Sequence, residues 1–514
     1  MFARLKSMGL NGIHGFMVEV EADLSSGLPG FDVVGLPGQA VKESRDRVRA
    51  ALKNSGFTYP VSRITVNLAP ADVRKDGSVY DLPLLLALLC ASGQLHPIPD
   101  DHAFLGELSL TGEVRPVHGV LPMVIAARDR GIRHVFVPAA CAAEGGVVDG
   151  IAVYPVENAL QLIHHLIGKT PLLPLTAEAL PPPPSLPLPD FADVMGQTAA
   201  RRAMEIAAAG GHNILLIGPP GSGKSMLAKR LPSILPDMTR EEELETTKIH
   251  SVAGTLPGGI GLLTTRPFRA PHHNISSAGL VGGGTVPRPG EVSLAHHGVL
   301  FLDELPEFSR SSMECLRQPL EDGKVTISRV SSSLTYPCSF MLVAAMNPCP
   351  CGFYGHPTRA CTCSPTAARQ YLSRISGPLL DRIDLHIDVP PVEFTQLSSK
   401  QPAESSADIR QRVNAARAVQ LKRFAALPGG DKLVCNAHIP SNLLKTLCPL
   451  TPGAENVLRR AFDQMGLSAR AYDRLLKVAR TIADLAGSEA IDTPHVAEAV
   501  QYRSLDRKYW QART

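Results

Sequence analysis

The first third of the chain consists of short apolar or alternating segments separated by polar stretches. The apolar and alternating segments predict strands at residues 18–22, 64–68, 135–138 and 151–154. Longer segments, with charges on one face or with an apolar interior, predict helices at residues 40–55, 82–89 and 121–130. Together these elements predict an α+β unit over residues 1–168.

A proline-rich segment follows this unit. Residues 170–190 contain eight prolines, four of them consecutive at 181–184. Because proline blocks helices and strand pairing and stiffens the chain toward polyproline II, the segment predicts an interdomain linker over residues 169–190. The alternative interpretation is a surface loop.

Wholly apolar short runs mark the central part of the chain. They predict buried strands at residues 214–217, 299–302 and 341–346, with a further strand after Arg382. Such strands are typical of a parallel α/β sheet, which we expect over residues 191–391. Helical patterns follow and predict a helical unit over residues 392–514, with helices at 406–424, 454–465 and 469–486.

The first apolar run of the central part leads into the segment GPPGSGKS and then into a predicted helix. This order is that of a phosphate-binding loop, whose glycines let backbone N–H groups approach phosphate oxygens. Lys224 would reach the β- and γ-phosphates of ATP, and Ser225 would hold Mg²⁺. The predicted nucleotide-binding residues are Gly218, Pro219, Pro220, Gly221, Ser222, Gly223, Lys224, Ser225, Met226 and Asp303.

The next two apolar runs also end in polar side chains. The run at 299–302 is followed by Asp303 and Glu304, and the run at 341–346 by Asn347. Asp303 would support Mg²⁺, and Glu304 would orient and polarise the attacking water. Asn347 could position the water or the γ-phosphate, although an asparagine in this place could also be a turn former.

Arginines near the end of the sheet and in the last predicted helix are candidates for charge stabilisation. An arginine placed before an apolar strand can reach a neighbouring subunit's γ-phosphate, and Arg382 is our first choice, with Arg374 second. The alternative is a surface ion pair of the arginine with Asp381 or Asp384. Arg470 lies in the first turn of its helix, where a cation opposes the helix dipole and indicates an anionic partner.

Four cysteines occur within 15 residues, directly after Asn347. Cys349, Cys351, Cys361 and Cys363 form two pairs with one-residue gaps, which are tighter than most structural zinc sites have. Four thiols in a loop rich in glycine and proline nevertheless favour a structural zinc, with His356 as a substitute ligand. Unligated thiols and disulfides are the alternatives.

Composition narrows the choice of partners. The 514 residues carry a formal net charge of +3, so a nucleic-acid partner would need a local basic patch. No apolar stretch is long enough to span a membrane, and the first residues lack the apolar core of a signal peptide. The other six cysteines are scattered, which favours a reducing cytoplasm.

Two segments could supply such a local patch for DNA. Residues 321–337 predict a hairpin that carries Lys324 and Arg329. The glycine-rich segment 250–284 has five cations in or beside it: Lys248, Arg266, Arg269, His272 and His273. Flexible cationic loops suit a channel that holds phosphates without reading bases. The alternative is that both are ordinary solvated loops.

The first unit resembles the proteolytic domain of the Lon family. The resemblance lies in KDG from Lys75, in residues 81–89, in LTGEVRPVHGV and in AARDRGIRHVFVP. Lon proteases cleave with a serine–lysine pair, but Asp81 and Leu121 stand at the matching positions. A carboxylate lacks the transferable proton of a serine and leucine is no base, so we expect a protease-like fold without protease chemistry.

Long segments from the phosphate-binding loop to the last helices resemble the ComM (YifB) family of magnesium-chelatase-like AAA+ ATPases. They are GPPGSGKS, FRAPHHNISSAGLVGGG, HHGVLFLDELPEF, MNPCPCG, SGPLLDRIDLHIDVP and GLSARAYDRLLKVARTIADL. The resemblance implies a hexameric ring that binds ATP at subunit interfaces, and its better-known members drive branch migration of DNA junctions during natural transformation. It implies ATPase roles for Lys224, Asp303, Glu304 and Asn347, for Arg382 as a finger acting on a neighbour, and for Arg470 as sensor 2.

These features predict an ATP-driven DNA motor, a helicase-like homohexamer that binds single-stranded or branched DNA without sequence preference. A chelatase-type ATPase that remodels proteins or inserts metal is the main alternative. An ATP-dependent protease is a third candidate, and the missing serine–lysine pair argues against it.

Overall fold

The computed structural model describes residues 1–176, 188–284, 287–329, 332–356, 358–392, 403–430 and 433–510. The side chains of Arg329, Ser332 and residues 506–508 lie outside this description. Residues 177–187 of the predicted linker also lie outside it, as does much of the polar connection after residue 392.

The N-terminal part contains a seven-stranded sheet in the order β3-β4-β2-β1-β5-β8-β9. Its strands are β1 (Phe2–Asn11), β2 (His14–Ser25), β3 (Gly30–Val34), β4 (Arg63–Ala69), β5 (His102–Phe104), β8 (His134–Pro138) and β9 (Ala152–Val156). A separate two-stranded ladder consists of β6 (Glu107–Leu108) and β7 (Val114–Arg115). The helices are α1 (Gln39–Lys42), α2 (Ser44–Asn54), α3 (Asp81–Ala91), α4 (Val120–Asp129), α5 (Ala142–Gly146) and α6 (Ala159–Leu166).

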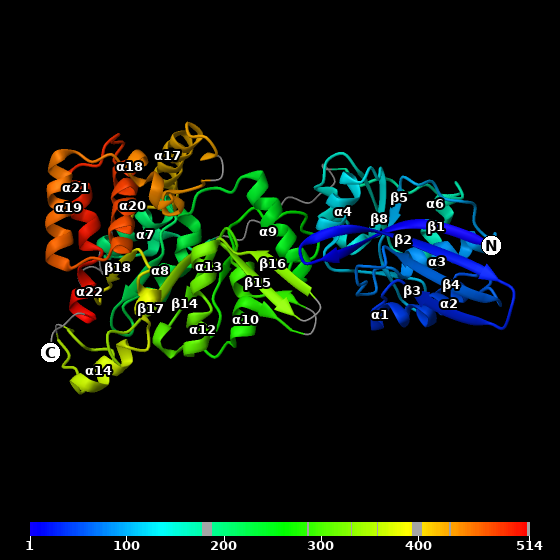
Figure 1. The fold of residues 1–514 in the computed structure, drawn as a ribbon, viewed down its shortest axis with the longest axis horizontal. Helices are drawn as coiled ribbons and strands as arrows, with labels where there is room; N and C mark the ends of the chain where they lie inside the picture. The colour runs from blue at the N-terminus through cyan, green and yellow to red at the C-terminus, as the bar shows by residue number, and fades with distance from the viewer. Residues whose placement is uncertain are drawn as a thin grey trace.

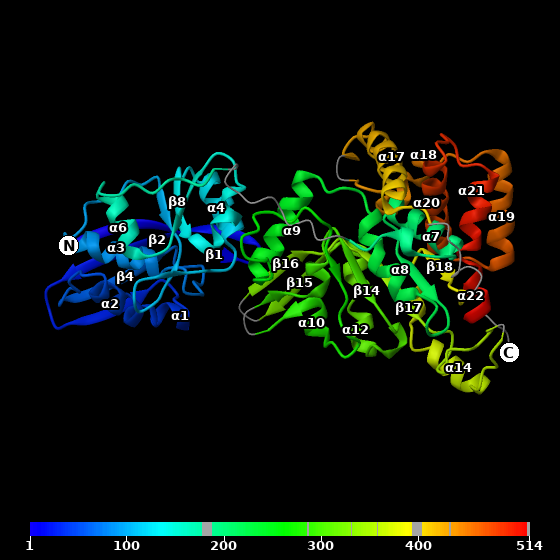
Figure 2. The same cartoon turned by 180° about the vertical axis from the view of Figure 1, so that it is seen from behind.

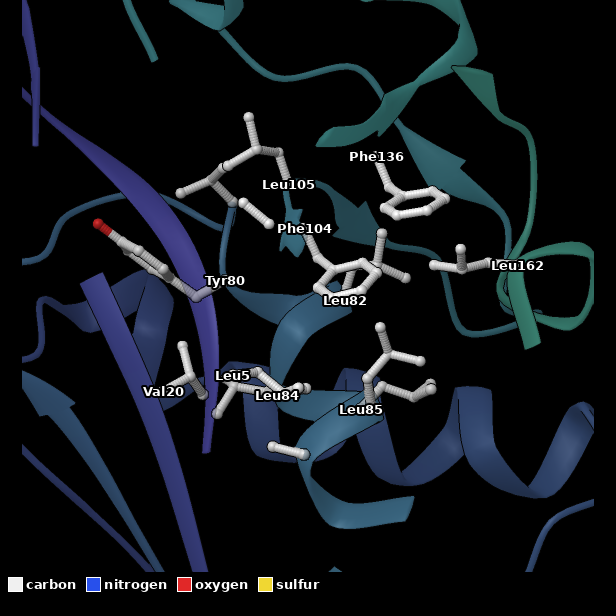
Figure 3. Packing of buried hydrophobic residues seen from close by; sticks show 14 of the residues in the cluster. Leu5, Val20, Tyr80, Leu82, Leu84, Leu85, Phe104, Leu105, Phe136 and Leu162 are labelled. Carbon is white, nitrogen blue, oxygen red and sulfur yellow. The ribbon is translucent and has the colours of Figure 1, made fainter. Parts of the chain in front are cut away.

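Helix α3 is the central element of this core. It is apolar all round, and all but one of its residues are buried, as expected of a helix covered on every side. Figure 3 shows Leu82, Leu84 and Leu85 of α3 facing Leu5 and the stacked aromatic rings on the sheet. These rings are Phe104 and Phe136, with centroids 5.0 Å apart.

The helical segment predicted at 40–55 is present, but it is divided into two helices. The structure has α1 and α2 in its place, separated at Glu43. The buried hydroxyl of Ser44 donates a hydrogen bond of 2.5 Å to the carbonyl of Val41. Serine side chains that bond to nearby backbone compete with the regular helix, and the periodic charges of this segment do not reveal that competition.

The central part contains a five-stranded sheet, which confirms the predicted parallel α/β core. Its order is β11-β14-β17-β10-β18, and every neighbouring pair is parallel. The strands are β10 (Ile214–Ile217), β11 (Phe268–Arg269), β14 (Val299–Leu302), β17 (Met341–Met346) and β18 (Leu385–Asp388). Because the strands are parallel, the residues that follow β10, β14 and β17 meet at one edge of the sheet.

Helices surround this sheet, and a hairpin projects beside it (Figure 1). The helices are α7 (Thr198–Gly210), α8 (Lys224–Arg230), α9 (Arg240–Ala253), α10 (Ser277–Val281), α11 (Glu291–Leu294), α12 (Arg310–Glu314), α13 (Arg317–Asp322), α14 (Pro365–Leu372) and α15 (Gly377–Leu380). The hairpin pairs β15 (Lys324–Arg329) with β16 (Ser332–Pro337), near the two-residue strands β12 (Gly282–Gly283) and β13 (Arg288–Pro289). Val325 and Ile327 of β15 are buried, whereas Lys324 and Thr326 are exposed.

The last part of the chain is helical and shares a hydrophobic core with one face of the five-stranded sheet. Its helices are α17 (Ser406–Ala425), α18 (Leu444–Leu447), α19 (Pro452–Met465), α20 (Ala469–Leu485), α21 (Thr493–Gln501) and α22 (Ser504–Tyr509). Ser468 caps α20 as predicted, since its side chain accepts a hydrogen bond from the amide of Ala471. Among the described residues, none of the helices has the length and apolar character that crossing a bilayer requires.

The N-terminal part meets the central part at α9 and at the hairpin. The amide of Gly119, before α4, donates a 3.1 Å hydrogen bond to the carbonyl of Ser251 in α9. Ile13, in the turn between β1 and β2, is buried in the same hydrophobic cluster that Leu334 of β16 packs against. Figures 1 and 2 show this turn reaching toward β16 and α9 from both sides of the molecule. The hairpin β15–β16 therefore lies between the two sheets.

Candidate functional site

The edge of the parallel sheet where β10, β14 and β17 end holds a cavity of about 390 Å³. Its walls come from the loop after β10, the start of α8, and the ends of β14 and β17. The lining residues are Pro220, Gly221, Ser222, Gly223, Lys224, Ser225, Met226, Asp303, Glu304, Met346 and Asn347. The structure therefore brings together the residues that the sequence predicted at three separate strand ends.

Three glycines of the loop after β10 are required by its geometry. A Cβ atom on Gly218 would lie 2.2 Å from the carbonyl oxygen of Val389, which no side chain tolerates. Gly221 and Gly223 have φ angles of 76° and 91°, in the left-handed region that favours glycine. The loop therefore turns tightly, with its backbone open toward the cavity.

Lys224 is the buried cation of the cavity. Its Nζ donates hydrogen bonds to the carbonyls of Gly218 at 2.7 Å and Pro219 at 2.9 Å, and to Oδ1 of Asn347 at 3.2 Å. Burial lowers the pKa of Lys224, and the charges of Asp303 and Glu304 oppose that shift. The ammonium group is thus held at the mouth of the loop, where an anionic ligand would strengthen its charged form.

Ser225 and Asp303 form the pair that could hold a magnesium ion. Oγ of Ser225 donates a 2.6 Å hydrogen bond to Oδ2 of Asp303. A hydroxyl and a carboxylate are the hard oxygen ligands that Mg²⁺ takes in nucleotide sites, so this donor set fits the ion. The hydroxyl of Ser222, also in the loop, is buried and has no hydrogen-bond partner among the described residues.

Glu304 is the residue after Asp303 and lines the cavity. Its φ angle is 52°, and its amide donates a 2.9 Å hydrogen bond to Oδ1 of Asp303. The φ angle lies in the left-handed region, and the side chain of Glu304 is 56% exposed. A carboxylate in this place could orient a water molecule against a phosphate.

His273 is a neighbour of Glu304 that the sequence analysis did not assign to the nucleotide site. Its Nδ1 lies 3.5 Å from Oε2 of Glu304. His273 comes four residues after Arg269, the last residue of β11, which pairs with β14. That placement after a neighbouring parallel strand is the signal that could have identified it.

None of the predicted charge-stabilising arginines is among the residues lining the cavity. Arg382 is 6% exposed, and its Nη2 lies 2.6 Å from Oε1 of Glu321. Arg374 is 53% exposed and pairs with Glu307 at 2.9 Å. Arg470 is exposed at the start of α20. The pairing of Arg382 with an adjacent aspartate that we considered is replaced by a pair with Glu321.

The four cysteines after β17 come together. Sγ of Cys349 lies 3.4 Å from that of Cys351 and 3.6 Å from that of Cys361, and the sulfurs of Cys351 and Cys361 are 3.5 Å apart. Sγ of Cys363 accepts a 3.3 Å hydrogen bond from the amide of Cys351. Four sulfurs around zinc at about 2.3 Å would be separated by about 3.8 Å, so the cluster fits a tetrahedral zinc and forms no disulfide.

His356 is not part of this cysteine cluster. Its Nδ1 accepts hydrogen bonds from the amides of Thr358 at 3.2 Å and Arg359 at 3.1 Å. The four thiols therefore come together without it. Gly352, within the cluster loop, packs so closely on Pro220 that a Cβ there would lie 2.4 Å from the Cδ of Pro220. The cysteine loop thus touches the phosphate-binding loop.

The predicted DNA-contacting cations have different surroundings. Lys324 is exposed at the base of the hairpin, and the side chain of Arg329 lies outside the described residues. Arg266 donates to Glu242 at 2.8 Å and to the carbonyl of Pro236 at 2.6 Å. Arg269 forms two hydrogen bonds with Glu291, at 2.6 and 2.8 Å. Because the guanidinium groups of Arg266 and Arg269 are occupied within the chain, their contacts argue against a phosphate-binding role.

Asp81, which the sequence resemblance predicted to stand at the position of a Lon serine, is part of a structural ion pair. Asp81 is 1% exposed and accepts hydrogen bonds from Nε of Arg47 at 2.6 Å and from Nη2 at 2.9 Å. The amide of Leu108 donates a further bond of 3.1 Å to the same carboxylate. Burial raises the pKa of Asp81, and the hydrogen bond from Arg47 opposes the shift. Leu121 is buried in α4.

Comparisons with known proteins identify the family of this chain. Models of the magnesium chelatase subunit ChlI match residues 190–397 and 20–141, and a model of its C-terminal part matches residues 403–503. The chain is 44% identical over 503 residues to the competence protein ComM of Haemophilus influenzae, and 45% identical over 501 residues to YifB of Escherichia coli, covering 96% of each chain in both cases. It is 30% identical over 162 residues to the magnesium-chelatase 67 kDa subunit of Chlorobaculum parvum, covering 31% of this chain and 23% of that protein. The chain therefore belongs to the ComM/YifB family of magnesium-chelatase-like AAA+ ATPases.

Proposed function

We propose that the protein is a ring-forming ATPase that uses ATP hydrolysis to move DNA, as in branch migration during recombination of transforming DNA. We infer that the protein forms a ring from the composition of the cavity. It holds a lysine, two carboxylates and an asparagine, yet no arginine is among its described lining residues. A site for phosphoryl transfer needs a further positive charge, and a second copy of the chain can supply it through Arg382.

The residues of the cavity have distinct roles in this proposal. Lys224 binds the β- and γ-phosphates, and Ser225 and Asp303 hold Mg²⁺, which neutralises developing charge when it is bound. Glu304 orients the attacking water, and Asn347, bonded to Lys224 at 3.2 Å, positions the γ-phosphate. Arg382 acts on the nucleotide of the adjacent subunit, and Arg470 acts as sensor 2.

The hairpin β15–β16 is the proposed DNA contact. Its exposed face carries Lys324, Thr326 and Ser328, a cation and two hydroxyls suited to phosphate oxygens. Val325 and Ile327, on the opposite face, are buried in the core, and this packing determines which face of the hairpin is exposed. One related protein is named for competence, the state in which cells take up DNA. Six such hairpins in a ring would hold DNA through its backbone without reading its sequence.

The test is ATP hydrolysis by the full-length protein with and without DNA. We expect branched and single-stranded DNA of unrelated sequences to raise the rate, and Glu304→Gln to abolish it in both conditions. If hydrolysis occurs but no DNA changes its rate, the DNA function is wrong while the ATPase assignment stands.

A chelatase-type ATPase that remodels a protein partner is the second candidate. The match of the family models to magnesium chelatase over residues 190–397 favours it. Such an ATPase should respond to a partner protein rather than to DNA. The same assay separates the two candidates, since a chelatase-type ATPase should show a rate independent of DNA.

We also propose that the cysteine cluster holds one structural zinc per chain. Its support is the convergence of four sulfurs and the contact of Gly352 with Pro220. Elemental analysis of the purified protein should find one zinc per chain, and Cys361→Ser should lose it. Cys315→Ser, which removes a half-buried thiol elsewhere, is the control. Zinc absent after expression in zinc-replete medium would favour free thiols.

A further inference from the structure

Arg382 is held inside its own subunit by one carboxylate. Nη2 of Arg382 lies 2.6 Å from Oε1 of Glu321, and its Nη1 donates a 2.7 Å hydrogen bond to the carbonyl of Pro378. The arginine is 6% exposed, whereas Glu321 is 54% exposed. The pair therefore lies at the surface, with the guanidinium inside and the carboxylate outside.

Glu321 is surrounded by positive charge. The hydrogen bond from Arg382 lowers the pKa of Glu321, and the charges of Arg382, Arg470 and Arg317 add to the shift. These include Arg382 and Arg470, the two arginines to which the proposed function gives roles in ATP hydrolysis. The carboxylate of Glu321 is thus paired with Arg382 and also feels the charge of Arg470.

The guanidinium of Arg382 has an unused donor. Its Nε is buried and has no hydrogen-bond partner among the described residues. A buried donor without a partner is costly, and an oxyanion with more acceptor oxygens than a carboxylate could satisfy it. Arginine binds carboxylates and phosphates through the same planar set of donors, so the two anions can replace each other.

Glu321 is also joined directly to the hairpin. It lies in the last turn of α13, which ends at Asp322, and β15 begins at Lys324. Gly323, with a φ angle of 62°, connects them, and its carbonyl accepts a 2.8 Å hydrogen bond from the amide of Cys338 at the end of β16. A movement of Glu321 would therefore move the base of the hairpin.

We propose that Glu321 is an internal substitute for a terminal phosphate, which holds Arg382 until the ATP of a neighbouring subunit takes its place. The exchange frees Glu321, α13 and the base of β15–β16. ATP bound at one subunit is thereby coupled to the hairpin of the next. This inference rests on the proposed action of Arg382 across the subunit interface, and it makes Glu321 a positioning residue rather than a catalytic one.

The experiment measures the affinity of the full-length protein for a fluorescent, non-hydrolysable ATP analogue without DNA. Glu321→Gln keeps the shape of the side chain but removes the competing charge. We expect it to bind the analogue about threefold to fivefold more tightly, the size of a partly exposed ion pair. Glu321→Asp, which keeps the charge, should change affinity less. Asp322→Asn removes the same charge from the next residue of α13 and should bind as the wild type does.

A second measurement distinguishes the proposed holding of Arg382 by Glu321 from a merely structural role of Glu321. In an Arg382→Ala background, Glu321→Gln should produce no further gain in affinity, because no guanidinium remains to be released. In otherwise wild-type protein, Glu321→Gln should also reduce the stimulation of hydrolysis by DNA.

Unchanged or weaker binding by Glu321→Gln would overturn the inference, as would a gain that persists without Arg382. Because the affinity measurement needs no DNA, its result does not depend on whether the proposed DNA function is correct. Sedimentation of the same samples tests ring formation independently.

Discussion

Oγ of Ser225 and Oδ2 of Asp303 lie 2.6 Å apart, although 78 positions separate the two residues in the chain. The parallel pairing of β14 with β17, and of β17 with β10, is what brings them together. Each residue follows a strand or a loop at the same edge of the sheet. The nucleotide site is therefore a direct consequence of the order of the strands.

The first prediction separates nucleotide binding from hydrolysis. Glu304→Gln should bind ATP but lower kcat about 100-fold or more, because it removes the charge that orients water. Lys224→Ala should instead weaken ATP binding, because the buried ammonium is lost. Equilibrium binding and steady-state hydrolysis measure the two effects. Glu455→Gln, which breaks an exposed pair with Arg459 on α19, is the control, and near-normal turnover in Glu304→Gln would refute the assigned role.

The second prediction concerns the contact between the cysteine loop and the phosphate-binding loop. Gly352→Ala should weaken ATP binding about threefold to tenfold, because the added Cβ would displace Pro220 at the cavity wall. Gly355→Ala is a close control, since Gly355 also has a positive φ of 72° but no atom within 4 Å of its added Cβ. Equal affinities in the two variants would show that the contact has no effect on nucleotide binding.

The third prediction concerns the N-terminal sheet. Asp81→Asn should lower the free energy of unfolding of this part by about 3 kcal/mol, because the change leaves the Arg47 charge without its buried partner. Asp129→Asn, which breaks an exposed pair with Arg128, should have little effect. Denaturant titration measures the stability, and casein should remain uncut by either variant or by the wild type. Casein cleavage that disappears in Asp81→Asn would mean that the N-terminal part is catalytic.

The fourth prediction concerns the hairpin. Lys324→Ala should flatten the dependence of log affinity for junction DNA on log salt, by about 0.9 for each DNA phosphate that the lysine neutralises in the wild type. It should also reduce the stimulation of hydrolysis by DNA. Lys445→Ala removes an exposed lysine of α18 and serves as the control. If Lys324→Ala binds DNA like the wild type across the salt range, the hairpin is not the DNA contact.

Local patterns were sufficient to predict the cavity. Lys224, Asp303 and Asn347 each follow an apolar strand at a short distance, so their meeting required only that the strands be parallel. The helix at 469–486 and its cap at Ser468 were predicted for the same reason, since the signals lie within one or two turns.

Long-range pairings could not be predicted in this way. Arg266 resembled a solvated loop cation in the sequence, but its guanidinium is bonded to Glu242 of α9. Glu321 is the first residue of the predicted hairpin segment, and nothing local indicates Arg382 as its partner. An ion pair leaves no periodic pattern in the sequence, so its two members are recognised only after folding has placed them together.

The most direct test of the shared active site mixes two inactive variants. Arg382→Ala subunits keep Glu304, and Glu304→Gln subunits keep Arg382, so an interface that combines the two intact halves can hydrolyse ATP. In an equal mixture about one quarter of the interfaces would be of this kind, because a ring repeats one head-to-tail interface. We predict that the mixture recovers up to that fraction of the wild-type rate, while each variant alone remains inactive. A mixture no more active than its components, or a fully active monomer, would contradict a site shared between subunits.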